Sequence, residues 1–464
     1  ATSWHWRSAV RERVRADRRF DEVRGLANAL MFQIHDSISD LNGSRPAREL
    51  LVTTAMQYLT SLAAESGGDP ALLIEVAAGH ERLGDLLGNP NSVNLGDTGA
   101  ALREYEHGLE ILASIGEPES DDRLRRAVAS LENRSGDVRT ARGERETAVE
   151  HHRRALELIR GPSRDPASAL PLAERRIEAA TILKIGDALS WNSDLAPALA
   201  SLEQATALLR AIAESPDSVD RDRFNLQIAL NKVGFVLGRI GRLDEALERQ
   251  QQALQVAEQL VRVEPGSAVR RRSVEIIRNQ LGAMLLELGR TDEAIAQIES
   301  ALASVRERVD ADPGNRQAQA DLAYTRNKMG EALWVRSAAD ALPHFQEALS
   351  IRKEHSDADP GNAVAHRSLA VSHLKVGECR LVLARERGAP KHAAASHARA
   401  AREHFTACAD MLEALREKGT LAEVDAAMPG QARSSAAECD ALLAELGVGG
   451  APHSGQRSQS GASR

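Results

Sequence analysis

The sequence predicts an all-α solenoid, a stack of repeated helix pairs, from its repeat length, its composition and its pattern of small residues. Glycines recur at Gly186, Gly234, Gly282, Gly330 and Gly377, so the step is 48 residues three times and then 47. A constant step of this size is typical of one supersecondary unit repeated in tandem. Aromatic residues make up only 3% of the 464 residues, while helix-forming Ala, Leu, Glu and Arg dominate.

The first 68 residues differ from the repeats. We expect a basic juxtamembrane segment at 1–19 and a helical hairpin that caps the solenoid at 20–68. Trp4 and Trp6 stand beside a series of arginines, which is typical of the exit of a membrane helix. An ordinary basic helix start is the alternative. The chain itself contains no run of about 20 apolar residues.

The repeats are recognised by small residues at constant offsets. A second glycine follows Gly136 after seven residues, alanines follow at twelve and nineteen, and the same offsets return after Gly234 and Gly282. Such residues let two antiparallel helices approach closely, with the first glycine at the crossing and the second in the turn. We expect about seven such repeats over 69–446 and a disordered Gly/Ser-rich tail at 447–464.

These offsets resemble the tetratricopeptide repeat (TPR), a helix-turn-helix unit of 34 residues. The resemblance implies a right-handed superhelix of antiparallel helix pairs. The period here is longer, and the positions of Pro265, Pro313 and Pro360 assign seven extra residues to each helix. Because seven residues make about two helical turns, each helix lengthens without rotating its buried stripe. The predicted fold is therefore a TPR-like α-solenoid with elongated 48-residue repeats.

A second resemblance covers roughly the first quarter of the chain. It is carried by DEVRGLAN at 21–28, HD at 35–36, NGSRPARE at 42–49, GGDP at 67–70, GD at 84–85, GNP at 88–90 and NLGD at 94–97. These motifs resemble the TPR portion that follows the transmembrane segment in large bacterial serine/threonine protein kinases. The resemblance implies a kinase domain and a single membrane span upstream of Ala1, and leaves the side of the membrane open.

Several kinds of chemistry are disfavoured by the residues present. No Gly-rich phosphate loop and no HRD or DFG motif occurs, so no catalytic or cofactor-binding residue is assigned and we do not expect an enzyme. The net charge of −8, with both signs interspersed, does not favour nucleic acid. The three cysteines form no CxxC pair, and His397 and His404 alone have a plausible same-face spacing, so we expect no metal site.

The strongest functional signal is a ladder of asparagines, each three residues before its glycine. Its members are Asn133, Asn231, Asn279 and Asn327. In the TPR family this position faces the concave groove, where an amide can bind an extended peptide backbone. Neighbouring groove residues expected to shape specificity are Phe235, Glu287, Glu331 and Trp334. The alternative is that the asparagines hydrogen-bond between adjacent helices.

The sequence thus favours a protein- or peptide-binding solenoid that serves as the sensor or interaction region of a bacterial serine/threonine kinase. The expected partners are a protein or peptide ligand, further copies of the chain and, through an upstream segment, the membrane. A free-standing TPR scaffold without a kinase is the alternative. A hydrolase or transferase with an unrecognised site is the weakest hypothesis.

Overall fold

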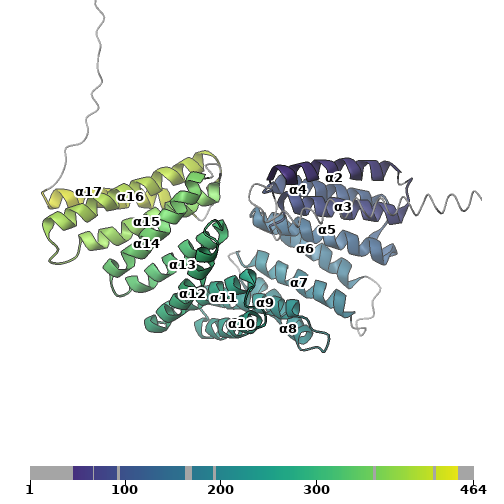
Figure 1. The fold of residues 1–464 in the computed structure, drawn as a ribbon, viewed down its shortest axis with the longest axis horizontal. Coiled ribbons are helices and arrows are strands. Elements are labelled where there is room, and N and C mark those ends of the chain that lie inside the picture. The colour runs from purple at the N-terminus through teal and green to yellow at the C-terminus, as the bar shows by residue number, and fades with distance from the viewer. Residues whose placement is uncertain are drawn as a thin grey trace, which may run out of the picture. The chain divides into compact units, whose positions relative to one another are not determined.

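A computed structural model describes residues 45–65, 67–90, 95–161, 170–191, 195–358, 362–421 and 425–447. The predicted juxtamembrane segment, the first helix of the predicted cap and nearly all of the predicted tail lie outside these residues. Within them, the secondary structure consists of α-helices and one 3₁₀ turn, with no β-strand (Figure 1). The predicted all-α, TPR-like class is confirmed. None of the described helices has the length and hydropathy needed to cross a membrane.

The chain up to Ile240 forms one compact unit, unit 1. Its helices are α2 (Arg45–Glu65), α3 (Pro70–Gly88), α4 (Thr98–Ala113), α5 (Asp122–Ala141), α6 (Arg145–Arg160), α7 (Leu172–Leu189), α8 (Ala196–Ala213) and α9 (Asp220–Ile240), with a 3₁₀ turn η1 (Pro118–Ser120) before α5. Each helix packs against the next, and α3, α5, α7 and α9 also contact one another in turn. These odd-numbered helices therefore form the more closely spaced, inner layer of unit 1.

The chain from Gly241 forms a second compact unit, unit 2. Its helices are α10 (Leu243–Val263), α11 (Ala268–Glu287), α12 (Thr291–Ala311), α13 (Arg316–Trp334), α14 (Ala338–Ala358), α15 (Ala363–Ala384), α16 (Lys391–Glu417) and α17 (Met428–Glu445). Consecutive helices again pack side by side, and α11 also contacts α13 (Figure 1). The 48-residue spacing of the glycines continues across the boundary at Ile240, so the repeat pattern does not predict this division.

Several helices begin at a polar residue that caps their first turn. Asp69 accepts a hydrogen bond from the Ala71 amide at the start of α3, and Asn315 accepts one from the Ala318 amide at the start of α13. A side-chain oxygen at this position satisfies a backbone N–H that has no partner within the helix. The starts of α3, α4, α5, α11, α13 and α15 are thus set locally by an Asp, Asn or Ser at the end of the preceding connection.

The ladder glycines lie where the two helices of a pair cross, as predicted. A Cβ atom added at Gly186 would lie 2.6 Å from Cγ of Leu202, and one at Gly282 would lie 2.6 Å from Cγ1 of Ile298. The turn glycines adopt left-handed backbone, with φ of +81° at Gly143. The alanines of the returning helices are fully buried; they are Ala148, Ala155, Ala198, Ala205, Ala246, Ala253, Ala294, Ala301, Ala341 and Ala348. Small residues therefore allow the close approach on both sides.

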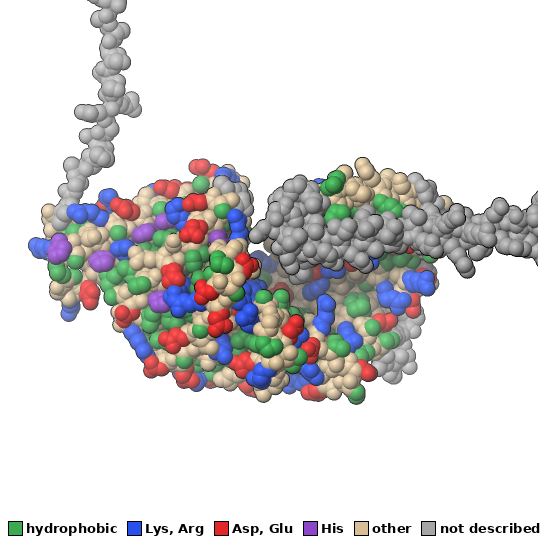
Figure 2. Space-filling model, in the orientation of Figure 1, with side chains coloured by type: hydrophobic (Ala, Val, Ile, Leu, Met, Phe, Trp, Pro, Cys, Tyr) green, Lys and Arg blue, Asp and Glu red, His purple; other side chains and the backbone are tan. Residues whose placement is uncertain are grey.

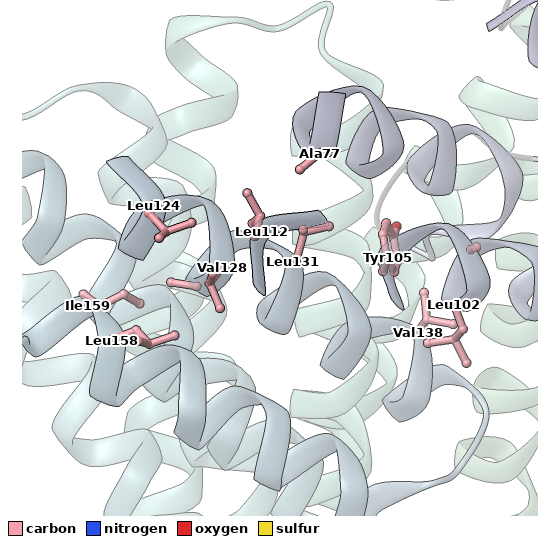
Figure 3. Close-up of a cluster of buried hydrophobic side chains, with 12 residues drawn as sticks. Ala77, Leu102, Tyr105, Leu112, Leu124, Val128, Leu131, Val138, Leu158 and Ile159 are labelled. Carbon is pink, nitrogen blue, oxygen red and sulfur yellow. The ribbon is translucent and has the colours of Figure 1, made fainter. Parts of the chain in front are cut away.

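An apolar cluster in unit 1 joins four consecutive helices, α3 to α6 (Figure 3). Tyr105 and Leu112 of α4 are fully buried and belong to one cluster with Leu131 of α5 and Leu158 of α6. Tyr105 also donates its hydroxyl to Oδ1 of Asp85 at 2.7 Å. This packing fixes the spacing of α4, α5 and α6, and so positions the inner layer.

Candidate functional site

The first rung of the asparagine ladder is buried between two inner helices of unit 1. Asn133 on α5 donates from Nδ2 to Oγ1 of Thr181 on α7 at 2.9 Å. Its Oδ1 lies 3.1 Å from Nδ1 of His152 on α6. The Asn133 residue is only 8% exposed. Its amide therefore holds three helices together.

In unit 2 the ladder continues between α11 and α13. Asn279 donates from Nδ2 to Oγ1 of Thr325 at 2.9 Å, and Asn279 is 2% exposed. Asn327 is 7% exposed, and its amide is assigned with the oxygen facing Arg352, from which it accepts at 2.8 and 3.0 Å. Arg352 in turn donates to Oγ of Ser372 on α15 at 2.7 Å. At Asn327 an arginine is thus inserted between the amide and the hydroxyl.

For Asn133, Asn279 and Asn327 the structure shows the arrangement of the alternative interpretation, hydrogen bonding between adjacent helices. Asn231 on α9 is half-buried. The sequence contains the signal for this arrangement, because a hydroxyl residue stands five positions before the next glycine at Thr181, Thr325 and Ser372. A role of the asparagines in binding a peptide stays a prediction.

Phe235, the predicted specificity residue of unit 1, lies against an exposed tryptophan. The ring centroids of Phe235 and Trp191 are 5.7 Å apart, and Trp191 is 55% exposed. The guanidinium of Arg145 lies over the Trp191 ring, 5.9 Å from its centroid. A cation over a ring face is an attractive contact, and it holds Trp191 at the surface.

The remaining predicted residues lie on α11 and α13 of unit 2. Glu287 is exposed, whereas Glu331 accepts a hydrogen bond from Nζ of Lys328 at 2.8 Å. Trp334 contacts Phe345 edge to face with centroids 5.7 Å apart, and Nζ of Lys375 lies 5.9 Å from the Trp334 centroid. These side chains are placed on the same inner helices but are engaged mainly with their own neighbours.

A ladder of charges accompanies the asparagines and was missed in the sequence. A basic residue stands two positions before almost every glycine, at Arg82, Arg134, Lys184, Lys232, Lys328 and Lys375, with Gln280 in the remaining place. In unit 1 it pairs with the acidic residue one position after the preceding glycine: Arg134 with Asp85 at 3.2 Å and Lys184 with Asp137 at 2.7 Å. These ion pairs link successive inner helices.

Unit 1 has a cleft of about 590 Å³ between α5, α7 and α9. It is lined by Asn133 and Thr181, by the apolar side chains of Ile159, Ile177 and Val219, and by the basic side chains of Arg126, Arg134, Arg176, Lys184 and Arg221. Ile177 is 44% exposed and Val219 is 51% exposed. The cleft therefore combines an apolar wall with a basic rim.

Most of the basic residues in the cleft are neutralised. Arg176 donates to both oxygens of Asp222, from Nε at 2.8 Å and from Nη2 at 2.7 Å. Burial opposes ionisation of Asp222, but the Arg176 hydrogen bonds and the Val219 amide outweigh it and lower the pKa of that carboxyl. Arg221, in contrast, is exposed and forms no ion pair with any residue that the structure describes.

In unit 2 the corresponding inner layer is closed by charged side chains. Arg308 donates to Oε2 of Glu275 at 2.6 Å and to Oδ2 of Asp321 at 2.8 Å, which joins α11, α12 and α13. Glu275 and Arg308 are both buried. Positions in the outer helices can be compared by counting from the crossing glycine, with allowance for the residue deleted in the turn after Gly330. By this count, Arg352 on α14 is equivalent to Ile159 on α6.

One histidine in each unit, the buried His152 and the half-buried His404, has a lowered pKa. Burial lowers the pKa of His152 to about 3, assisted by the nearby Lys184 and His151. Burial also lowers the pKa of His404 to about 4, assisted by His373, whose Nδ1 lies 2.9 Å from Nδ1 of His404. In the described part of the chain, no group of three or more metal-ligating side chains is arranged to hold a metal ion.

Comparison with known proteins adds a local family match. Residues 228–261 match the sequence profile described as "Tetratricopeptide repeat". A comparison with curated proteins gives no match. The family match covers one repeat of the chain.

Three solved structures to which the chain is similar are RapI, the quorum sensor NprR and a Rap protein. The apo form of RapI is 13% identical, with a TM-score of 0.46 over 90% of this chain and 99% of that one. The apo form of the quorum sensor NprR from B. thuringiensis is 11% identical, with a TM-score of 0.41 over 87% and 99%. A Rap protein complexed with Competence and Sporulation Factor is 14% identical, with a TM-score of 0.39 over 85% and 99%.

Proposed function

We propose that the chain recognises proteins through extended peptide segments, and that the cleft between α5, α7 and α9 of unit 1 is a binding site. The observation that carries the proposal is the cleft itself. It leaves Ile177 and Val219 exposed beside a buried amide and hydroxyl, in a volume of about 590 Å³. A concave, partly apolar site with a few fixed polar groups is the ordinary form of a ligand site.

The cleft suits a peptide with one apolar side chain flanked by polar backbone. The apolar side chain would cover Ile177 and Val219 and remove their surface from water. Arg126 and Arg221 at the rim are both exposed and can donate to peptide carbonyl or carboxylate groups. The inner helices, which are tied by the Asn133–Thr181 rung and the Lys184–Asp137 pair, present these groups in fixed positions.

The test is a selection of peptides from a random display library on the purified chain, followed by affinity measurements with synthetic peptides. We expect Ile177→Asp to weaken the selected peptides by about tenfold or more, because it places a charge in the apolar wall. Val263→Asp is the matched control, since Val263 is 66% exposed on α10, outside the cleft. Equal effects of the two substitutions, or the absence of any selected binder, would contradict the proposal.

We also propose that this region is the sensor part of a membrane-tethered bacterial serine/threonine kinase. Support comes from the motifs between residues 21 and 97, which resemble the corresponding part of such kinases. Partner binding or self-association would then control the proximity of the attached kinase domains. The reading frame upstream of Ala1 tests this: it should encode a kinase domain and an apolar segment. A start codon near Ala1 would instead favour the free-standing scaffold.

A further inference from the structure

Arg352 is the most unusual charged side chain of unit 2, because it is half-buried and none of its partners is a carboxylate. Its Nη1 donates to Oγ of Ser372 at 2.7 Å and to the Ser368 carbonyl at 3.3 Å. The Asn327 oxygen accepts from Nη1 at 2.8 Å and from Nη2 at 3.0 Å. All of these acceptors are neutral.

Comparison with the buried Arg308 shows that Arg352 lacks a carboxylate partner. Arg308 is bound by Glu275 and also contacts Asp321, so its charge is fully compensated. Glu331 is the carboxylate that acts most on Arg352, but it accepts a hydrogen bond from Lys328. Burial accordingly lowers the pKa of Arg352, whereas the pKa of Arg308 is raised because its carboxylate hydrogen bonds outweigh burial. A buried charge without a partner is costly for the folded state.

The hydrogen-bonding groups of Arg352 that remain unused lie on one edge of the guanidinium. Both hydrogens of Nη1 and one of Nη2 are directed to Ser372, Ser368 and Asn327. The Nε–H and the second hydrogen of Nη2 have no acceptor among the residues that the structure describes. This is the side-on edge that binds both oxygens of a carboxylate in a bidentate pair.

We propose that Arg352 binds a carboxylate of an acidic peptide at the inner face of unit 2, through its Nε and Nη2 edge. This inference rests on the proposed peptide-binding function and adds the chemical class of ligand for a second site. Asn327 and Ser372 hold the guanidinium from behind, so its orientation is fixed before binding. Tyr324, which is 41% exposed on α13, offers an apolar surface on the same inner helix.

The site can be isolated by repeating the peptide selection on the full chain that carries Ile177→Asp, which disables the unit 1 cleft. We expect the selected peptides to be enriched in Asp or Glu. Each peptide is then synthesised with its acidic residue and with the matching amide, and both are measured against wild type and Arg352→Leu. Lys353→Leu is the control, because it removes an equal charge from the neighbouring, 63% exposed side chain, which pairs with Asp357.

The expected result is a coupling between the two changes. Replacing the peptide carboxylate by the amide should weaken binding to wild type and to Lys353→Leu by about tenfold, and change binding to Arg352→Leu by less than about twofold. Arg352→Lys, which keeps the charge but lacks the fork, should lose most of the discrimination. The thermal midpoint of Arg352→Leu should not fall, since Leu209 occupies the equivalent place in α8.

Two results would overturn the proposal. Arg352→Leu and Lys353→Leu with equal effects on the acidic peptide would show a general charge effect only. A large fall of the thermal midpoint of Arg352→Leu without a change in peptide discrimination would make Arg352 a structural bridge between α13 and α15. In either case, peptides whose affinity depends on Ile177 would still support the proposed function of unit 1.

Discussion

The α5–α6 repeat of unit 1 and the α13–α14 repeat of unit 2 are built alike but carry different side chains at one position of the outer helix. In unit 1 this position is Ile159, an apolar side chain that lines an open cleft. In unit 2 it is Arg352, a cation that extends between two inner helices and contacts Asn327 and Ser372. The helix pairs are built alike, but the residue at this one position differs. It gives an apolar wall to the cleft of unit 1 and a half-buried positive charge to unit 2.

The same contrast appears in how the inner helices are joined. Unit 1 links them through half-buried pairs such as Lys184 with Asp137, whereas unit 2 links α11 and α13 through the buried group of Glu275, Arg308 and Asp321. Ion pairs near the surface contribute little to stability, but removing one member of a buried group leaves an uncompensated charge. The comparison teaches that the Glu275, Arg308 and Asp321 group of unit 2 is largely buried, whereas in the Lys184–Asp137 pair of unit 1 the cation is partly exposed.

The largest expected effect is that of Arg308→Met in unit 2. This substitution leaves Glu275, which is 2% exposed, without its guanidinium partner. We therefore expect the free energy of unfolding to fall by about 3–5 kcal/mol. Urea unfolding measures the loss, and hydrogen exchange should localise it to α11, α12 and α13. Arg126→Met is the control in unit 1, because Arg126 is 52% exposed and lies 3.7 Å from Glu174; its loss should stay below about 1 kcal/mol. Similar losses would remove the contrast between the units.

Acid should destabilise both units through their neutral histidines. The pKa values of His152 and His404 are lowered to about 3 and about 4 in the folded chain. Below pH 6.5, the usual pKa of histidine, the unfolded chain therefore binds more protons than the folded chain. Stability is therefore present above pH 6.5 and falls as the pH falls, by about 2 kcal/mol at pH 5 for the buried His152 and by less for the half-buried His404, which solvent screens. Below pH 4 the folded chain protonates His404, so the contribution of unit 2 levels off while that of unit 1 continues to grow.

Single substitutions separate these two histidine contributions. His152→Leu places in α6 the residue that Leu202 provides in α8, and should flatten the dependence of the unfolding free energy on pH in unit 1. His404→Gln should do so in unit 2. Figure 2 shows several histidine side chains on the surface of unit 2, and their titration must be separated from that of His404. Substitution of the exposed His392 is the control for this surface contribution. A profile that His152→Leu and His404→Gln leave unchanged would contradict the assignment.

The sequence predicts the helix pairs well because their geometry depends on single small residues. Gly186 and Gly282 are identified by spacing alone, and each lies where a Cβ would meet the facing helix. The inner-layer contacts are harder to predict, because the partner of Asn133 is Thr181, 48 residues away on another helix. The choice between a groove amide and a bridge between helices depends on packing distance, which spacing does not give.

The cleft and the Arg352 site were not predicted for a further reason. Both depend on a position of the outer helix, Ile159 or Arg352, whereas the predicted groove residues all lie on the inner helices. A long side chain from the outer layer reaches the inner face between two crossing helices. Comparing the residues at each offset from the glycine would have marked Arg352 as the one charged member of an otherwise apolar set of Ile159, Leu209, Ala257 and Val305.

Alanine substitutions of Asn133 and Asn279 should lower the unfolding free energy by different amounts, both smaller than the effect of Arg308→Met. Asn133 binds both Thr181 and His152, whereas Asn279 binds Thr325 and its Oδ1 has no partner in the described structure. We therefore expect Asn133→Ala to lower the unfolding free energy by about 2 kcal/mol and Asn279→Ala by about 1 kcal/mol. Urea unfolding of the two variants measures this. Equal losses would mean that the His152 contact adds nothing to the rung.

The smallest effect is expected for Arg221→Gln at the rim of the unit 1 cleft. Arg221 is exposed and forms no ion pair with a described residue, so its loss should change stability by less than about 0.5 kcal/mol. It should weaken an acidic peptide in the cleft by no more than about threefold, and the effect should vanish at high salt, because exposed charges are screened. Discrimination by Arg352 should persist under the same conditions, since a half-buried pair is screened much less. Titrations with the two acidic peptides at low and high salt measure both effects, and equal salt dependence at the two sites would mean that burial of the cation makes no difference to recognition.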